Sequence, residues 1–172
     1  MKLARTPLVA LALLLAPAVI ASAPHAETLE WRNWNEGAAE ASSSGRPMLV
    51  DVYTDWCGWC KRMDRDVYAL EDVRQYLNKH FVPVRLNAES TAEARHGGRT
   101  LTSRALAQQL RVSGYPTTIF IKPDGAHIAS VPGYVPADRF RLMLRYIAED
   151  HIGRGVSWPQ FEKSAAAGPI RP

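Results

Sequence analysis

Apolar and polar residues alternate along this chain in two periods, which predict interleaved strands and helices. Short apolar runs rich in Val, Ile and Phe, bounded by Pro, Gly or Asp, are typical of buried strands. Such runs lie at residues 47–53, 81–86, 117–121 and 127–131. Stretches whose apolar residues recur every three or four positions are typical of amphipathic helices. Such stretches lie at residues 34–41, 57–67, 70–79, 102–110 and 136–150.

The order of these elements, β-α-β followed by α-β-β-α, predicts an α/β fold with a central mixed sheet and helices on both faces. We expect one domain over residues 27–150, which is long enough to enclose a core. Residues 88–100 are polar, contain Gly97-Gly98, and are predicted to form a loop. Residues 151–172 are predicted to form a tail, with Trp158 and Phe161 packed on the body and a mobile end.

Residues 1–23 have the layout of a secretory signal peptide. Lys2 and Arg5 precede an apolar run over residues 8–20, and Ala21-Ser22-Ala23 follows it. Cleavage is expected after Ala23 or, because Pro24 comes next, after Ala26. The apolar run is short for a membrane span, but an uncleaved anchor remains an alternative. We therefore expect a secreted, periplasmic protein.

Net charge gives little information about partners. Removing the signal peptide would lower the formal net charge from +4 to +2. No basic run is interleaved with aromatic residues, so nucleic-acid binding is not expected. We expect the mature chain to be a monomer.

The only two cysteines, Cys57 and Cys60, form a CxxC motif. This spacing makes both the dithiol and the disulfide accessible, and its position between a predicted strand and a predicted helix is typical of a redox motif. Cys57 would lie exposed at the helix N-terminus, where backbone N–H groups favour a thiolate. Cys60, one turn further, would be shielded. Cys57 would attack a substrate disulfide, and Cys60 would then resolve the mixed disulfide.

Other uses of two cysteines remain open at this point. Exported proteins often carry structural disulfides, although a bridge closing so short a loop removes little chain entropy. Zinc requires further ligands, and the chain has no second CxxC or paired-histidine motif. Haem attachment requires CxxCH, whereas Lys61 follows Cys60. We expect no metal and no cofactor.

The pattern resembles the thioredoxin superfamily, in particular its secreted bacterial thioredoxin-like members and the C-terminal domain of transmembrane disulfide reductases. The resemblance covers roughly residues 48–149 and rests on five features in the same order. It implies a thioredoxin fold. By this resemblance Asp51, six residues before Cys57, is the buried acid that takes the proton of Cys60. The alternative is a solvent-facing carboxylate at a strand edge.

The resemblance also assigns substrate-binding positions. Trp56 and Gly58 occupy the family's positions around the nucleophile. Trp59 departs from the family, which usually has Pro there, so the redox potential stays open. Tyr115 and Pro116 match the family's cis-proline loop, which faces the CxxC and pairs with an extended substrate; a trans turn is the alternative.

Three further features complete the comparison with the family. Gly133 matches the glycine that completes the substrate groove, although an ordinary turn glycine is the alternative. Arg85 stands where thioredoxins have Lys, and it either holds Asp51 ionised or points to solvent. The segment with Arg95, His96 and Arg99 is longer than in thioredoxin, and it contacts a partner or is a solvated loop.

The resemblance implies a periplasmic thiol–disulfide oxidoreductase that mainly reduces protein disulfides. The histidine that marks strongly oxidising members is absent next to Cys60. Expected partners are disulfide-bonded periplasmic proteins as substrates and a membrane thiol reductase as electron donor. A disulfide oxidase or isomerase, and a non-catalytic binding module, are the alternatives.

Overall fold

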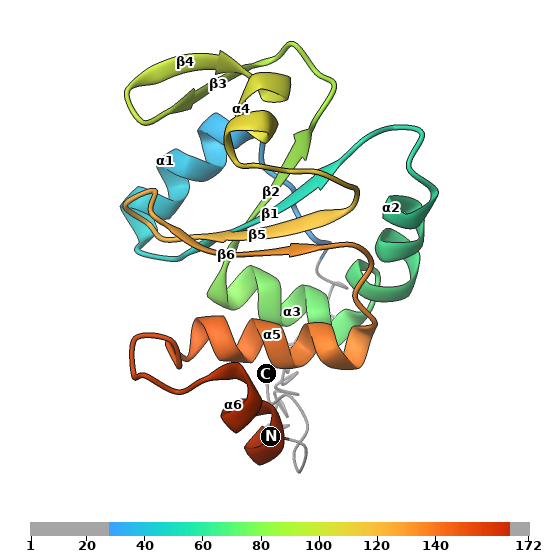
Figure 1. Ribbon diagram of the computed structural model, residues 1–172, viewed down its shortest axis with the longest axis vertical. Coiled ribbons are helices and arrows are strands. Elements are labelled where there is room, and N and C mark those ends of the chain that lie inside the picture. The colour runs from blue at the N-terminus through green and yellow to red at the C-terminus, as the bar shows by residue number, and fades with distance from the viewer. Residues whose placement is uncertain (1–27, 166–172) are drawn as a thin grey trace, which may run out of the picture.

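A four-stranded sheet forms the centre of the computed structural model, which describes residues 28–165 (Figure 1). The strands are β1 (Met48–Tyr53), β2 (Val82–Asn87), β5 (Thr117–Ile121) and β6 (His127–Pro132). They are arranged in the order β2-β1-β5-β6. Strands β1 and β2 are parallel, whereas β5 is antiparallel to both β1 and β6. The expected mixed sheet is therefore confirmed.

Helices cover both faces of this sheet, as Figure 1 shows. One face carries α1 (Trp34–Ser44) and α4 (Ser103–Gln109). The other carries α2 (Gly58–Met63), the π-helical turn η1 (Asp64–Tyr68), α3 (Glu71–His80) and α5 (Ala137–Ala148). Successive strand residues point to opposite faces, so Leu49 packs in one apolar cluster and Val50 in the other. This is why the central strands β1 and β5 are mostly apolar on both faces, although Asp51 lies within β1.

The prediction of a loop over residues 88–100 was wrong. The segment contains β3 (Glu93–His96), which forms an antiparallel hairpin with β4 (Arg99–Thr102). Gly97 and Gly98 connect the strands with φ of 57° and 73°, the left-handed conformations that a tight two-residue hairpin turn requires. The strands are short and mostly polar, so they lack the apolar alternation by which strands are predicted.

Helix α1 holds this hairpin in place. The Trp34 indole N–H donates to the Arg95 carbonyl at 2.8 Å. The Asn35 side chain donates to the Glu93 carbonyl at 3.0 Å and accepts from the Arg95 N–H at 2.8 Å. The outer edge of β3 is thus paired with side chains about 60 residues earlier in the chain.

The C-terminal part contains a helix that the sequence analysis did not predict. Helix α6 (Trp158–Ala165) packs on α5. Phe161 is buried, with its ring 5.3 Å from that of Tyr146 and 4.5 Å from that of His151. The expected packing of Trp158 and Phe161 on the body is therefore confirmed.

The structure leaves the two predicted terminal segments outside its description. The signal peptide with both cleavage sites falls within residues 1–27, and the predicted mobile end falls within residues 166–172. Between these limits, no helix is both long enough and apolar enough to cross a membrane.

Candidate functional site

Cys57 and Cys60 are joined by a disulfide at the N-terminus of α2, where their Cα atoms lie 5.3 Å apart. Cys57 is the N-cap residue, and its Sγ accepts the backbone N–H of Cys60 at 3.1 Å. A helix N-terminus presents unpaired N–H groups to whatever occupies this position. The predicted placement of Cys57 at a helix N-terminus is therefore confirmed.

The exposure of Cys57 differs from the expectation. Both cysteines are nearly buried, with 4% of Cys57 and 5% of Cys60 exposed. The disulfide places the Cys57 sulfur against the Cys60 sulfur, which is itself nearly buried. Trp56 and Trp59 are the large apolar side chains exposed here, at 66% and 55%.

Asp51 lies in the middle of β1 with only 2% of its surface exposed, so the solvent-facing alternative is excluded. Its Oδ1 accepts the Tyr68 hydroxyl at 3.4 Å, and its Oδ2 lies 3.4 Å from the Nε of Arg85. Burial raises the pKa of Asp51 to about 7, against the opposing attraction of Arg85. A carboxyl group with such a pKa can exchange a proton near neutral pH.

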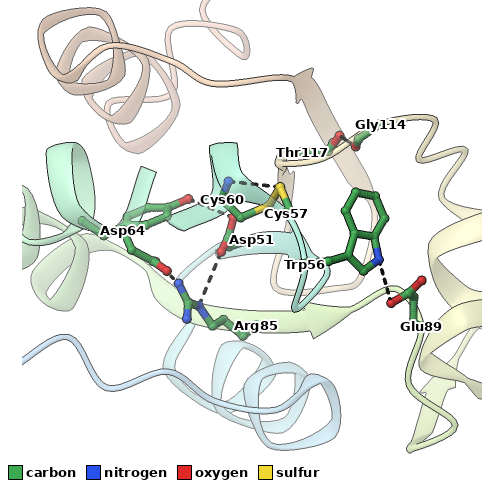
Figure 2. The surroundings of a disulfide bond; sticks show 10 residues. Asp51, Trp56, Cys57, Cys60, Asp64, Arg85, Glu89, Gly114 and Thr117 are labelled. Atoms are coloured by element: carbon green, nitrogen blue, oxygen red, sulfur yellow. Dashed lines mark hydrogen bonds and ion pairs between the residues drawn. A yellow bond between two sulfur atoms is a disulfide. The ribbon is translucent and has the colours of Figure 1, made fainter. Parts of the chain in front are cut away.

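Arg85 points inward, so the alternative in which it faces solvent was wrong. Its guanidinium forms an ion pair with Asp64 and lies near Asp51. It also lies over the rings of Trp31 and Tyr53, at 4.7 Å and 5.2 Å from their centroids. Figure 2 shows Asp51 between the disulfide and Arg85. The positive charge of Arg85 lowers the pKa of Asp51. Burial raises this pKa by more, and the nearby negative charge of Asp64 raises it further.

The loop before β5 has the predicted geometry. The Tyr115–Pro116 peptide bond is cis. The Thr117 hydroxyl donates to the Gly114 carbonyl at 2.7 Å, as Figure 2 shows. The Pro116 carbonyl accepts the N–H of Gly133 at 2.7 Å. Gly133 has φ of 86°, a conformation that side chains with a Cβ adopt at a cost, which accounts for glycine at this position.

Trp56 contacts two residues that lie far from it in the sequence, Glu89 and Tyr115. Its indole N–H donates to the Glu89 carboxylate at 3.1 Å (Figure 2), and its ring meets that of Tyr115 edge to face at 6.0 Å. Glu89 was not predicted as a site residue. No local pattern identifies it, because 33 residues separate it from Trp56.

Trp59 belongs to a second cluster, which the sequence analysis did not predict. Its ring centroid lies 5.6 Å from that of Tyr134, and the Arg62 guanidinium lies 5.3 Å from Trp59 and 5.4 Å from Tyr134. Arg62 also forms an ion pair with Asp66 at 3.1 Å. The i, i+3 spacing of Trp59 and Arg62 on a helix is the signal that could have indicated their contact.

The predicted site residues therefore gather from three parts of the chain around one disulfide. In residues 28–165, no group of three or more His, Cys, Asp or Glu side chains is placed to hold a metal ion. The arrangement offers a dithiol–disulfide pair, a buried carboxyl group and a cis-proline loop.

A family model described as thioredoxin-like domain matches residues 34–148. Among solved structures, a thioredoxin-fold protein from Helicobacter pylori superposes with a TM-score of 0.63 at 23% identity, covering 72% of this chain and 82% of that one. A thioredoxin from Thermus thermophilus gives a TM-score of 0.61 at 24% identity, covering 75% and 94%. The predicted thioredoxin fold is confirmed.

The curated relatives include thiol:disulfide interchange protein DsbD from Yersinia enterocolitica. It is 35% identical over 111 residues, which cover 63% of this chain and 18% of the relative. This chain thus spans less than a fifth of the length of that protein. The predicted resemblance to a domain of transmembrane disulfide reductases is confirmed for the thioredoxin-like domain of this chain.

Proposed function

Because this chain belongs to the family of thioredoxin-like domains, we propose that it is a thiol–disulfide oxidoreductase that mainly reduces protein disulfides in the periplasm. The observation that carries the proposal is the Cys57–Cys60 disulfide at a helix N-terminus, with Asp51 buried nearby. The relative's designation as a thiol:disulfide interchange protein supports the same chemistry.

The reaction proceeds in two exchange steps. The Cys57 thiolate attacks one sulfur of the substrate disulfide, forming a mixed disulfide and releasing the other substrate sulfur as a thiolate. The Cys60 thiolate then attacks the Cys57 sulfur, which restores the Cys57–Cys60 disulfide and releases the second substrate thiol. Two electrons pass from the cysteine pair to the substrate. The disulfide in this structure corresponds to the oxidised product.

Asp51 acts on the second step. Cys60 must lose its proton before it attacks, and Asp51 is the buried group whose pKa lies near neutrality. Cys57 has the helix N-terminus to favour its thiolate. The division of roles follows from position: Cys57 caps the helix, and Cys60 lies within it.

The substrate backbone binds at the cis-proline loop. The peptide before Pro116 presents Tyr115 to an extended segment, which pairs as an added strand. Trp56, Gly58, Trp59 and Gly133 border the same position. The edge-to-face contact between Trp56 and Tyr115 supports this placement by fixing one wall of the site.

The direction of electron flow is tested by the redox potential of the Cys57–Cys60 pair, measured by equilibration in glutathione buffers. We expect a value near that of thioredoxin, about −270 mV. A value near that of strong oxidants, about −120 mV, would instead assign the protein to disulfide formation.

The need for the cysteines is tested by substitution. Cys57→Ser is expected to abolish the reduction of insulin disulfides. A cysteine-free variant that keeps full biological function would instead indicate a binding module.

Localisation and partners are tested together. We infer that residues 1–23 are removed on export and that the mature protein acts as a monomer in the periplasm, recharged by a membrane thiol reductase. N-terminal sequencing of the mature protein from a periplasmic fraction tests the cleavage. Cys60→Ser leaves the mixed disulfide unresolved, so it is expected to trap the substrates covalently on Cys57 for identification. A protein retained in the cytoplasm with its first 23 residues would contradict the export model.

A further inference from the structure

An apolar groove of about 430 Å³ lies between strand β6, helix α5 and the start of helix α6. Ala129 and Val131 form its strand wall, and Met143 and Ile147 form its helix wall. Among the described residues that line it, Arg139 is the only charged one. An open groove with such walls is typical of a binding surface for apolar groups.

Two residues connect the lining of the groove to the redox site. Tyr134 lines the groove, and its ring also contacts Trp59, which lies between the two cysteines. Pro132 lines the groove as well, and it directly precedes Gly133, which donates to the Pro116 carbonyl. A polypeptide bound at the cis-proline loop would therefore have the groove next to it.

Strand β6 offers a backbone edge beside the groove. In the part of the chain that the structure describes, β6 pairs with β5 and with no other strand. An unpaired strand edge can accept an extended segment as an additional strand. Because side chains alternate between faces, every second residue of that segment would point toward the side on which Ala129 and Val131 line the groove.

We propose that this groove is a second substrate subsite, which holds a large apolar side chain from the extended segment that flanks the substrate cysteine. The inference rests on the proposed function and deepens it. The two cysteines react with sulfur atoms that every disulfide contains, so they cannot distinguish one protein disulfide from another. The groove supplies that distinction by favouring disulfides next to an exposed Leu, Ile, Phe or Met.

Peptides with a single cysteine, joined in a mixed disulfide to thionitrobenzoate, provide the test. One series places a Leu at successive distances from the cysteine on either side, and a matched series has Ser at the same positions. The release of thionitrobenzoate by the reduced full-length protein gives second-order rate constants. We expect one window of spacings in which Leu raises the rate constant roughly tenfold, as partial burial of one Leu side chain would produce.

Two substitutions on neighbouring positions of β6 assign this preference to the groove. Ala129→Glu places a charge on the groove wall, whereas Ser130→Glu places the same charge on the opposite face of the same strand. The Leu preference is the ratio of the rate constant of the Leu peptide to that of the matched Ser peptide. This ratio is expected to fall to about one in Ala129→Glu and to persist in Ser130→Glu. Reduction of bis(2-hydroxyethyl) disulfide, which is too small to reach the groove, is expected to stay unchanged in both. Ile152→Glu, at the exposed rim, repeats the test at a position with little effect on folding.

The outcomes separate this inference from the proposed function. If the protein reduces the small disulfide but shows no Leu preference at any spacing, the subsite is overturned and the proposed function stands. If it reduces neither substrate, the proposed function fails. Two other outcomes would also overturn the subsite. If the Leu preference appears only after deletion of residues 166–172, the groove normally binds the chain's own C-terminus. If it appears only at protein concentrations low enough for a dimer to dissociate, the groove normally binds a second copy of the protein.

Discussion

At the scale of single residues, burial and neighbouring charges determine what Asp51 can do. Arg85 provides an opposite charge, but Asp64 shares that charge through its own ion pair with the same guanidinium. Desolvation of Asp51 therefore prevails, and its pKa rises to about 7. The protein keeps a carboxyl group that is close to half protonated at neutral pH.

Asp51→Asn is expected to stabilise the oxidised protein in alkaline solution and to have little effect in acid. Because the pKa is raised in the folded state, the folded protein binds more protons than the unfolded chain between about pH 4 and pH 7, and its stability falls as the pH rises through that window. The gain is expected to be a few kcal/mol at about pH 8 and close to zero at about pH 4. Urea unfolding at both pH values measures it, and an equal gain at both would contradict the assignment.

The same substitution separates the two chemical steps. Asp51→Asn should slow resolution of the mixed disulfide by Cys60 more than the initial attack by Cys57, because only the former needs the buried carboxyl group as a proton acceptor. Stopped-flow measurements across neutral pH report both rates. Resolution kinetics that match the wild type at every pH would remove Asp51 from the mechanism.

The two cysteines are expected to differ in reactivity once the disulfide is reduced. Cys57 occupies the N-cap position, where thiolate is favoured, and Cys60 lies inside the helix. Iodoacetamide near neutral pH is expected to modify Cys57 roughly tenfold or more faster than Cys60, measured by mass spectrometry of digested peptides. Equal rates, or faster modification of Cys60, would overturn the assignment of Cys57 as the attacking thiol.

At the scale of elements, the helices pack closely on the sheet. In α1, the size of one residue determines how closely the helix can approach strand β2. Gly37 lies where α1 crosses β2, and a Cβ at this position would overlap the side chain of Val84. Val84 is fully buried and cannot move aside without disturbing the core. A glycine inside a helix, which normally costs helix stability, is here required by packing.

Gly37→Ala is therefore expected to lower the free energy of unfolding by about 1–3 kcal/mol through overpacking, although Ala favours helices by about 1 kcal/mol. Denaturant unfolding measures the loss. The matched control is the same change in a Val84→Ala background, where the removed methyl groups make room. The two substitutions should then be coupled, and strictly additive losses would exclude the overlap.

At the scale of the whole molecule, two apolar clusters lie on opposite faces of one sheet, and α6 extends the cluster that contains α5. Phe161 anchors α6 through ring contacts with Tyr146 and His151. Trp158 also lines the apolar groove. The C-terminal helix therefore contributes both to stability and to the shape of the groove.

Phe161→Ala is expected to lower the free energy of unfolding by about 3 kcal/mol, because Phe161 is 2% exposed and its removal leaves a cavity. Lys163→Ala, on the exposed side of the same helix, should change it by less than about 0.5 kcal/mol. Thermal and urea unfolding of both variants compare them. A small effect of Phe161→Ala would show that α6 contributes little to the stability of the domain.

How far the sequence predicts the structure depends on how local each feature is. The strands β1, β2, β5 and β6 were predicted within one or two residues because their apolar runs are long. The hairpin of β3 and β4 was missed because its strands are polar and α1 holds it. Helix α6 was missed because the residues after α5 are rich in Gly, Pro and Ala, which are typical of loops.

The sequence by itself determined the order of elements, the CxxC pair at a helix N-terminus, the acid within the preceding strand and the proline loop before β5. Each of these depends on residues that are close together in the chain, where periodicity, turn chemistry and motif spacing act directly. Only the tertiary structure decided the partners of Arg85, the Trp59–Tyr134 contact and the groove along β6. These features join side chains that lie tens of residues apart, and packing of the whole domain determines which distant side chains meet.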